Sequence, residues 1–325
     1  MLSPIDDARY ERQIQLPQVG ETGQLRLKNA RVLVIGAGGL AAGVLPILVG
    51  SGVGFIRLYD ADVVDLSNLH RQTLYRMSDI GTFKVDAAAK HLQQLNPEVC
   101  IENHAEYVHS ANLAIAMQNI DIVVDAADRF ATTYLLSDYC FLHKLPLVSA
   151  SVLAEQGYVG AFCGATAPSY AAIFPQLPQQ AASCATAGVL PSSVAVLASM
   201  QAHMVINLIL DLQPTALAQL IQINLSTWHI QAFSFQGAPE PEQPLLWLDE
   251  YAIQAHDRVL DFRAGHEIRH PFAAQVEYIS FEQLASLEFD PLQRVICVCA
   301  SGIRAAKAAN VLRKNNLAVY IAAAL

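Results

Sequence analysis

The sequence is poor in charged residues. Only 15% of its 325 residues are charged, whereas 53% are hydrophobic, so we expect a large buried core, enough for two domains or one large one. The net charge of −9 argues against a nucleic-acid partner, because such binding needs broad neutralisation of phosphates. The sequence shows no internal repeat and no low-complexity tract.

Paired cysteines and a secretory signal are also lacking. The six cysteines form no CxxC pair, and the N-terminal stretch is polar with mixed charge. We therefore expect free thiols in the reducing cytoplasm. Residues 189–210 are long and apolar enough to raise the question of a membrane, but polar residues interrupt them. We expect a buried helix there and no membrane partner.

The most informative stretch is residues 31–60. An apolar run stops at Gly36, a turn containing Gly38 and Gly39 precedes a helical stretch, and a second apolar run ends at Asp60. This order is the layout of a nucleotide-binding βαβ unit. Backbone N–H groups at such a turn can hold phosphates and the carboxylate can hold a ribose hydroxyl, whether the ligand is ATP, NAD or FAD.

Apolar runs alternate with helical stretches over the first part of the chain. The strand candidates are residues 31–35, 55–59, 120–125, 145–149 and 158–162. Such alternation predicts an α/β fold with a mostly parallel sheet. Ligands of open α/β sheets gather at the carboxyl ends of the strands.

A break in composition divides the chain. Residues 237–245 carry three prolines and no apolar pattern, which predicts a linker between one domain at 1–236 and a second, abbreviated α/β domain at 246–325. In the second domain, the expected elements are a strand end at 259–263, a strand at 294–299, a helix at 301–314 and a last strand at 319–322.

Ordered motifs surround the glycine turn. They are RYERQ at 9–13, DADVVDLSNLHRQ at 60–72, GTFK at 81–84, a D-x-x-D strand end at 125–128, and a cysteine shortly before Ala-Gly at 187–188. In this combination, residues 8 to 235 resemble the MoeB/ThiF/HesA family. The resemblance implies a Rossmann-like doubly wound sheet of the ubiquitin-activating-enzyme type. It also implies ATP-dependent adenylation of the C-terminal carboxylate of a ubiquitin-like sulfur carrier ending in Gly-Gly, for molybdopterin or thiamine synthesis.

Adenylation chemistry gives several of these residues a role. A carboxylate attacks the α-phosphorus of ATP and pyrophosphate leaves, so two anions meet and the site needs cations and a metal. Arg71 and Lys84 are placed in sequence to supply that charge, and Asn68 and Gln72 to donate neutral hydrogen bonds. The glycines let the backbone approach the phosphates, and Asp60 would accept from the ribose.

The resemblance itself implies three further residues. Asp128 matches the family's catalytic aspartate, which helps to hold Mg²⁺. Arg12 matches an arginine that reaches the phosphates from the other subunit, which implies a homodimer. Cys184 matches a cysteine that, in some members, bonds to the carrier or its sulfur; an inert, partly buried thiol is the alternative reading.

A second motif lies near the C-terminus. Cys299 ends an apolar run and opens a loop that runs to Arg304, where a helix follows. Backbone N–H groups and the helix dipole would favour a thiolate or persulfide at this sulfur. With DFR at 261–263 and Glu267, residues 246–325 resemble the rhodanese family. The resemblance implies that Cys299 carries sulfur for transfer, drawn from a cysteine desulfurase or a small thiol.

The chain also departs from the first family's pattern. The place of one CxxC pair reads SYAA at 169–172, and the place of the other, near the linker, has no cysteine. We therefore predict no zinc, with the packing of residues 171–174 in its place. Arg129 follows Asp128, and Thr133 stands where an arginine is expected. Either the cation has moved within the site or the handling of ATP is impaired.

Two alternatives remain open on the sequence. An NAD-dependent oxidoreductase would explain the glycine turn and Asp60, although no hydride-transfer site is visible. A non-catalytic binding scaffold would explain Arg129, Thr133 and the lacking zinc ligands.

Overall fold

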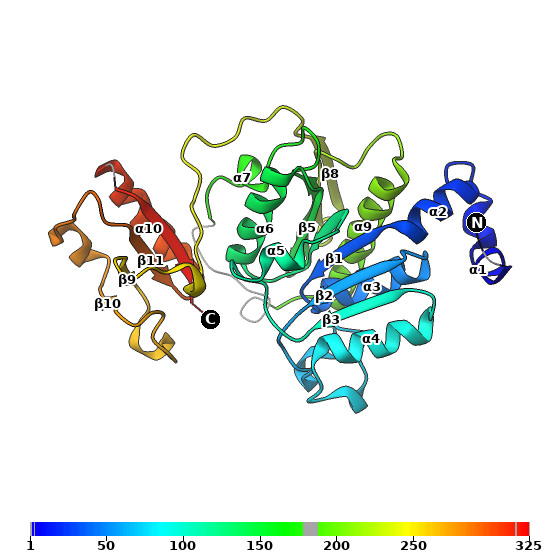
Figure 1. Ribbon diagram of the computed structural model, residues 1–325, viewed down its shortest axis with the longest axis horizontal. Helices are drawn as coiled ribbons and strands as arrows, with labels where there is room; N and C mark the ends of the chain where they lie inside the picture. The colour runs from blue at the N-terminus through cyan, green and yellow to red at the C-terminus, as the bar shows by residue number, and fades with distance from the viewer. Residues whose placement is uncertain (1, 3, 178–187, 316, 325) are drawn as a thin grey trace.

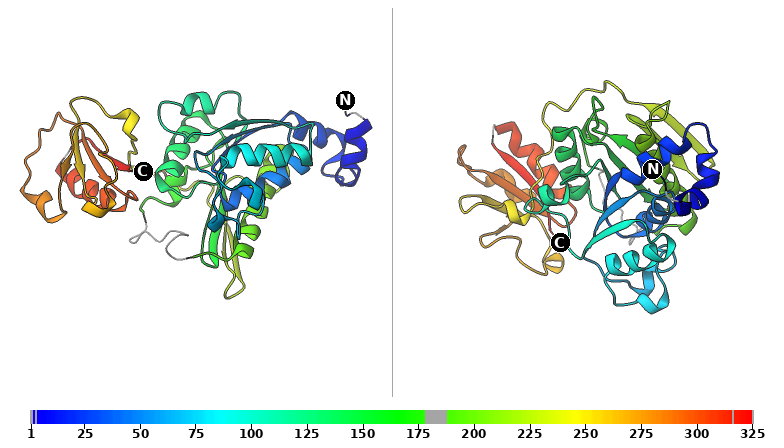
Figure 2. Two further views of the ribbon diagram at one scale, coloured as in Figure 1. Left: turned by 90° about the horizontal axis from the view of Figure 1, so that it is seen from below. Right: turned by 45° about the vertical axis from the view of Figure 1, so that its right-hand side comes forward.

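The computed structural model describes residues 2, 4–177, 188–315 and 317–324. It contains an eight-stranded sheet and a four-stranded sheet. The smaller sheet lies at one end of the molecule and the N-terminal helices lie at the other (Figure 1, Figure 2).

The larger sheet has the order β3-β2-β1-β4-β5-β6-β7-β8. Strands β3 to β5 pair in parallel, and β6, β7 and β8 continue the sheet in antiparallel pairs. The strand order reverses direction between β1 and β4, and this switch point is where ligands of doubly wound sheets bind. The strands are β1 (Arg31–Ile35), β2 (Phe55–Tyr59), β3 (Cys100–His104), β4 (Ile122–Asp125), β5 (Leu147–Leu153), β6 (Gln156–Phe162), β7 (Gln219–Asn224) and β8 (His229–Ser234).

Helices cover both faces of this sheet (Figure 1). Alternate residues of β1 serve the two faces: Val32 and Val34 join the core under α3 and α9, whereas Leu33 and Ile35 join the core under α5 and α6. This alternation explains why β1 reads as a continuous apolar run. The helices of this part are α1 (Pro4–Ile14), α2 (Gly20–Asn29), α3 (Gly39–Gly50), α4 (Lys84–Leu95), α5 (Leu113–Ala116), α6 (Phe130–His143), α7 (Tyr170–Ile173) and α9 (Pro191–Leu210).

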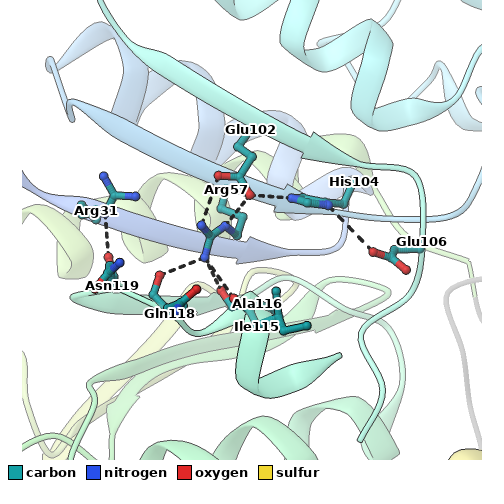
Figure 3. Close-up of polar contacts among 9 residues, drawn as sticks. All are labelled: Arg31, Arg57, Glu102, His104, Glu106, Ile115, Ala116, Gln118 and Asn119. Carbon is teal, nitrogen blue, oxygen red and sulfur yellow. Dashed lines mark hydrogen bonds and ion pairs between the residues drawn. The ribbon is translucent and has the colours of Figure 1, made fainter. Parts of the chain in front are cut away.

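One arginine ties β2 to its neighbours. Arg57 makes a bidentate ion pair with Glu102 of β3, at 2.8 and 3.1 Å. It also donates to the carbonyl groups of Ile115, Ala116 and Gln118, at and beyond the end of α5 (Figure 3). His104 bonds the same glutamate at 2.7 Å and stacks on Tyr59. The carboxyl ends of β2 and β3 are thereby fixed beside each other.

The long helix α9 belongs to the core. It is the one described helix long and apolar enough to cross a membrane by length and composition, yet half of its apolar window is buried and it packs on α3, β5 and β6. Its Gln201 is fully buried and donates to the carbonyl groups of Asp125 and Val148 at 2.7 and 3.0 Å. Through these bonds from its Nε2, Gln201 ties α9 to β4 and β5, while its Oε1 has no partner among the described residues.

The smaller sheet is parallel throughout, with the order β10-β9-β11-β12. Its centre is held by a buried ion pair between Asp261 and Arg263, whose side chains are 0% and 2% exposed. One helix, α10, follows the central strand β11. The elements are β9 (Arg258–Asp261), β10 (Glu277–Tyr278), β11 (Val295–Cys299), α10 (Ile303–Leu312) and β12 (Val319–Ala323).

The segment between the two sheets makes contacts with both units. Glu240 accepts hydrogen bonds from the backbone N–H and hydroxyl of Ser169, ahead of α7. Trp247 pairs with Ile321 of β12 as an isolated bridge, and its indole, 7% exposed, stacks on Tyr134 of α6 at 5.5 Å. The domain boundary at 237–245 therefore remains a prediction. The segment from Glu240 to Trp247 is fixed by contacts at each end.

Candidate functional site

The glycine turn lies where β1 meets α3. Gly36 donates to the carbonyl of Tyr59 at 2.9 Å and has a φ of +94°. A Cβ atom at Gly36 would lie 2.6 Å from the carbonyl oxygen of Ala126, just after β4, so only glycine fits there. A Cβ atom at Gly38 would meet nothing within 4 Å. The turn is closed on its protein side and open on the other.

Asp60 braces this turn. Its carboxylate accepts from the backbone N–H groups of Ala37 and Asp62, both at 2.7 Å, and Tyr75 donates to the carbonyl of Ala37 at 2.7 Å. Burial raises the pKa of Asp60, and the hydrogen bond from Ala37 opposes that shift. A carboxylate has about four acceptor positions, so Asp60 keeps capacity for a ribose hydroxyl.

Lys84 lies one step further from the turn. Its side chain is 7% exposed and forms an ion pair with Asp62 at 2.7 Å. Tyr107 donates to the other oxygen of Asp62 at 2.5 Å. Burial alone would raise the pKa of Asp62, but the bonds from Lys84 and Tyr107 lower it overall. The guanidinium of Arg129 lies over the Tyr107 ring, 4.7 Å from its centroid.

The motif at 68–72 packs against the start of α3. A Cβ atom at Gly39 would lie 3.7 Å from Cγ of Arg71, which places this arginine beside the turn. Gln72 is 3% exposed, and its Oε1 has no hydrogen-bond partner among the described residues. Asn68 is half-buried and accepts from the backbone of Gln72. A buried amide oxygen without a protein partner can accept a hydrogen bond from a ligand.

The two aspartates after β4 have different environments. Asp125 is 1% exposed and accepts from the hydroxyls of Thr133 and Ser149, both at 2.8 Å, and burial raises its pKa to about 6. Asp128 is exposed and makes no hydrogen bond or ion pair with a described residue. Thr133 therefore serves the buried aspartate, whereas Asp128 is available to a ligand.

Two of the sequence-predicted residues are not brought to this cluster. Arg12 is exposed on α1, and no described side chain binds it. Cys184 lies outside the described residues. The other candidates, Gly36, Gly38, Gly39, Asp60, Asn68, Arg71, Gln72, Lys84 and Asp128, all follow β1, β2 or β4 in the sequence, toward the carboxyl edge of the sheet.

The second candidate site is the loop after β11. Cys299 is fully buried, and its sulfur accepts from the backbone N–H of Ala305 at 3.4 Å. Arg304 binds Glu267 through one nitrogen at 2.6 and 2.7 Å. Burial alone would lower the pKa of Arg304, but Glu267 and, to a smaller extent, Cys299 raise it overall. The loop therefore holds a permanent cation beside the thiol.

Residues 169–173 are held by a helix cap and by aromatic contacts. Ser169 caps α7 by accepting from the N–H of Ala172, and Tyr170 contacts Tyr134 edge-on at 5.2 Å. Among the described residues, no group of three or more His, Cys, Asp or Glu side chains could hold a metal ion.

The cluster fits a nucleoside triphosphate and a magnesium ion. Open space above Gly38 and the unpaired Oε1 of Gln72 leave room and a polar contact for a ligand. Mg²⁺ is bound through one or two carboxylates together with substrate phosphates, which suits Asp128.

Sequence reasoning missed Tyr107 and left Asp62 unassigned. Tyr107 follows β3, a strand that the apolar pattern did not reveal because its burial is discontinuous. Both residues could have been found from their positions just after β3 and β2, because residues past the carboxyl ends of neighbouring parallel strands meet at one edge of the sheet.

Known proteins with similar sequences were found for most of the first unit. The profile of the ThiF family matches residues 10–245. The chain is 43% identical over 205 residues to the adenylyltransferase and sulfurtransferase MOCS3 of Culex quinquefasciatus, covering 62% of this chain and 47% of that protein. It is 42% identical over 211 residues to a sulfur carrier protein adenylyltransferase of Thermus thermophilus, covering 63% of this chain and 78% of that one. The chain thus spans about half the length of the MOCS3 relatives.

Solved structures share the fold. Microcin C7 biosynthetic enzyme MccB in complex with N-formylated MccA aligns with a TM-score of 0.63 at 24% identity, over 71% of this chain and 73% of that one. The complex of E. coli MccB with ATP aligns at 0.61 and 23% identity, over 73% of both chains. PaaA aligns at 0.61 and 23% identity, over 72% of this chain and 74% of that one. At this identity the likeness establishes the fold alone.

Proposed function

The chain belongs to the ThiF family, and from this premise we propose that it is an ATP-dependent adenylyltransferase acting on the C-terminal carboxylate of a small sulfur-carrier protein. The name of the Thermus thermophilus relative supports the substrate class. The ATP complex of MccB, which has the same fold, supports the nucleotide. These matches do not favour an NAD-dependent oxidoreductase.

One observation carries this proposal. A continuous set of hydrogen bonds runs from the open glycine turn through Asp60 and Asp62 to Lys84. It fixes a buried ammonium group close to the turn, and Arg71 flanks the same turn. Cations fixed beforehand near developing negative charge are the main catalytic requirement of phosphoryl chemistry.

The residues divide the work as follows. The N–H groups of the turn and the start of α3 face the phosphates, and Asp60 accepts from the ribose. Arg71 and Lys84 stabilise the charge that grows on the phosphorus oxygens and the leaving pyrophosphate. Asp128 would hold Mg²⁺, which supplies neutralising charge between the two anionic reactants. The Asp62–Lys84 pair keeps the ammonium oriented when no nucleotide is bound.

We expect Asp128→Ala to lower ATP–pyrophosphate exchange on the order of 10²–10³-fold, because one charge-stabilising contact is lost. The assay uses the full chain with Mg²⁺ and candidate carriers that end in Gly-Gly. Asp121→Asn is the matched control, since Asp121 precedes β4 at the opposite edge of the sheet. If the wild-type chain shows no exchange with any carrier, the proposal is wrong; undiminished exchange in Asp128→Ala removes this residue from the mechanism.

We also propose that Cys299 accepts sulfur as a persulfide from a cysteine desulfurase or a small thiol donor. The names of the MOCS3 relatives include sulfurtransferase activity. In this structure, the sulfur is buried behind the loop that contains Gly302. Transfer therefore requires that the loop move. The outer sulfur of the Cys299 persulfide would attack the acyl adenylate of the carrier and displace AMP, which gives an acyl disulfide. Cys184 would then attack the Cys299 sulfur, releasing the carrier thiocarboxylate and leaving a Cys184–Cys299 disulfide that an external thiol reduces.

Incubation with a sulfur donor is expected to add one sulfur atom to the wild-type chain and none to Cys299→Ser, because the acceptor thiol is removed. Intact-mass spectrometry under non-reducing conditions reads the difference. Cys100→Ser is the control, since Cys100 is an exposed thiol on β3. An equal sulfur adduct on Cys299→Ser would show that this cysteine has no role as acceptor.

A homodimer completes the proposal. Arg12 is exposed and unbound by described side chains of its own chain, so it is free to approach the phosphates of a second subunit. Molybdopterin or thiamine synthesis in the cytoplasm is the setting we propose for the pathway.

A further inference from the structure

We propose that Arg129, supported by the ring of Tyr107, binds the triphosphate of ATP in this chain and replaces the cation that Thr133 does not supply. The inference rests on the proposed function, because it assigns a residue to the same nucleotide site. It concerns nucleotide affinity, which can be measured whether or not a carrier is adenylated.

The placement of the two side chains is the first argument. Arg129 lies between β4 and α6. In the sheet order β3-β2-β1-β4, strand β4 is separated from β3 by β1 and β2. Tyr107 follows β3, yet the guanidinium carbon lies 4.7 Å from its ring centroid. The contact therefore reaches across the ends of β1 and β2, where the glycine turn and Asp60 lie.

The ring is held in place by the site itself. Tyr107 donates to Asp62 at 2.5 Å, and Asp62 also binds Lys84 at 2.7 Å. The tyrosine thus has a fixed orientation before any ligand arrives. Its aromatic face attracts the guanidinium by a cation–π contact, which places Arg129 without using its N–H groups.

The donors of Arg129 are the second argument. Within the described part of the chain, the guanidinium of Arg129 makes no hydrogen bond or ion pair and lies over the ring of Tyr107, whereas its backbone carbonyl accepts from Thr133. A cation–π contact uses none of the guanidinium N–H groups as donors, and these groups match two oxygens of a phosphate. Lys84 forms an ion pair with Asp62 at 2.7 Å, whereas Arg129 lies near enough to that carboxylate to help lower its pKa but forms no ion pair with it.

The third argument explains why the cation stands at this position. Thr133 is directed inward, where its hydroxyl binds the buried Asp125 at 2.8 Å. An arginine at this position is larger than threonine and would not fit in the same space beside Asp125. A triphosphate carries the highest charge of the substrates and benefits most from a second free cation.

Nucleotide titrations of the full chain test this inference. With Mg²⁺ present, Arg129→Gln is expected to weaken ATP binding about 10- to 100-fold, the effect of losing hydrogen bonds to a charged group. AMP binding should change less than about twofold, since AMP lacks the outer phosphates. Tyr107→Leu should weaken ATP binding as Arg129→Gln does, whereas Tyr107→Phe keeps the ring and should have a smaller effect. Arg129→Lys should fall between wild type and Arg129→Gln.

The control removes a positive charge from the other end of the same helix. Lys144→Gln changes the exposed residue that ends α6, and it should bind ATP as the wild type does. Circular dichroism confirms that each variant is folded. Unchanged ATP affinity in folded Arg129→Gln, or an equal loss for ATP and AMP, would overturn the inference.

Steady-state exchange kinetics separate this inference from the proposed function. If Arg129→Gln raises KM for the carrier and leaves KM for ATP unchanged, the arginine binds the carrier's carboxylate and the inference is wrong. If the wild type binds ATP with the stated dependence on Arg129 but catalyses no exchange, the inference holds and the proposed adenylation fails. A wild-type chain that binds no ATP overturns both.

Discussion

Gly36→Ala is expected to destabilise the first unit by about 2–5 kcal/mol. A non-glycine residue in left-handed backbone costs about 1–2 kcal/mol, and Gly36 has a φ of +94°. Overpacking adds about 1–3 kcal/mol, because the new methyl would lie 2.6 Å from the carbonyl of Ala126. That carbonyl belongs to the backbone after β4 and has little freedom to move. Denaturant unfolding followed by circular dichroism measures the loss.

Gly38→Ala is the matched partner of this experiment. Gly38 has a φ of −83°, and its methyl would meet no protein atom within 4 Å. We expect its stability to lie within about 0.5 kcal/mol of wild type. ATP affinity should nevertheless fall, because the methyl occupies space that the phosphates need. Wild-type stability in Gly36→Ala would contradict the turn geometry, and wild-type ATP affinity in Gly38→Ala would show that the nucleotide does not approach the turn.

Arg263→Met is expected to destabilise the second unit by about 3–5 kcal/mol, because it leaves Asp261 as an unpaired buried charge. The two side chains are 2% and 0% exposed, and their ion pair measures 2.7 Å. Arg263 also donates to the carbonyl of His270 at 3.1 Å, so the loop after β9 loses a contact as well. The midpoint of denaturant unfolding, followed by a probe within this unit, measures the effect.

Two further variants show whether the lost stability comes from the unpaired charge of Asp261. The double variant Asp261→Asn with Arg263→Met removes both charges and should lose less than Arg263→Met alone. Arg258→Met breaks a more exposed ion pair, with Glu277, whose side chain is 47% exposed, and should also lose less. An equal loss in the single and double variants would mean that packing, and not charge, sets the cost.

The sequence predicted those features that depend on local pattern. Strands β1 and β2 were located to the residue, because both are largely buried: β1 is apolar after Arg31, and β2 is apolar or aromatic on either side of Arg57. The α/β fold with a mostly parallel sheet followed from the alternation of strands with helices, and the resemblance to the MoeB/ThiF/HesA family implied its Rossmann-like, doubly wound form. Three strands of the larger sheet were missed for the converse reason: β3 and β7 are only partly buried, and every residue of β8 is exposed.

Long-range partners could not be predicted in the same way. Nothing near Thr133 in the sequence indicates that its hydroxyl binds Asp125, nor does Arg129 indicate a contact with Tyr107, which belongs to another strand end. These contacts arise from the sheet order, and the order is a property of the folded chain. The pattern identified the residue types of the site and left their pairing open.

The position of Trp247 gives the molecule an intrinsic optical signal. The chain has two tryptophans; Trp228 is 85% exposed, whereas Trp247 is 7% exposed between Tyr134 and the loop of Gly302. A Cβ atom at Gly302 would lie 2.4 Å from this indole, so the loop cannot shift without changing its surroundings. Movement of the loop that exposes Cys299 would therefore wet Trp247 and shift its emission to longer wavelength, while the emission of Trp228 stays constant. Sulfur loading and the separation of the two units can thus be followed in real time without a label.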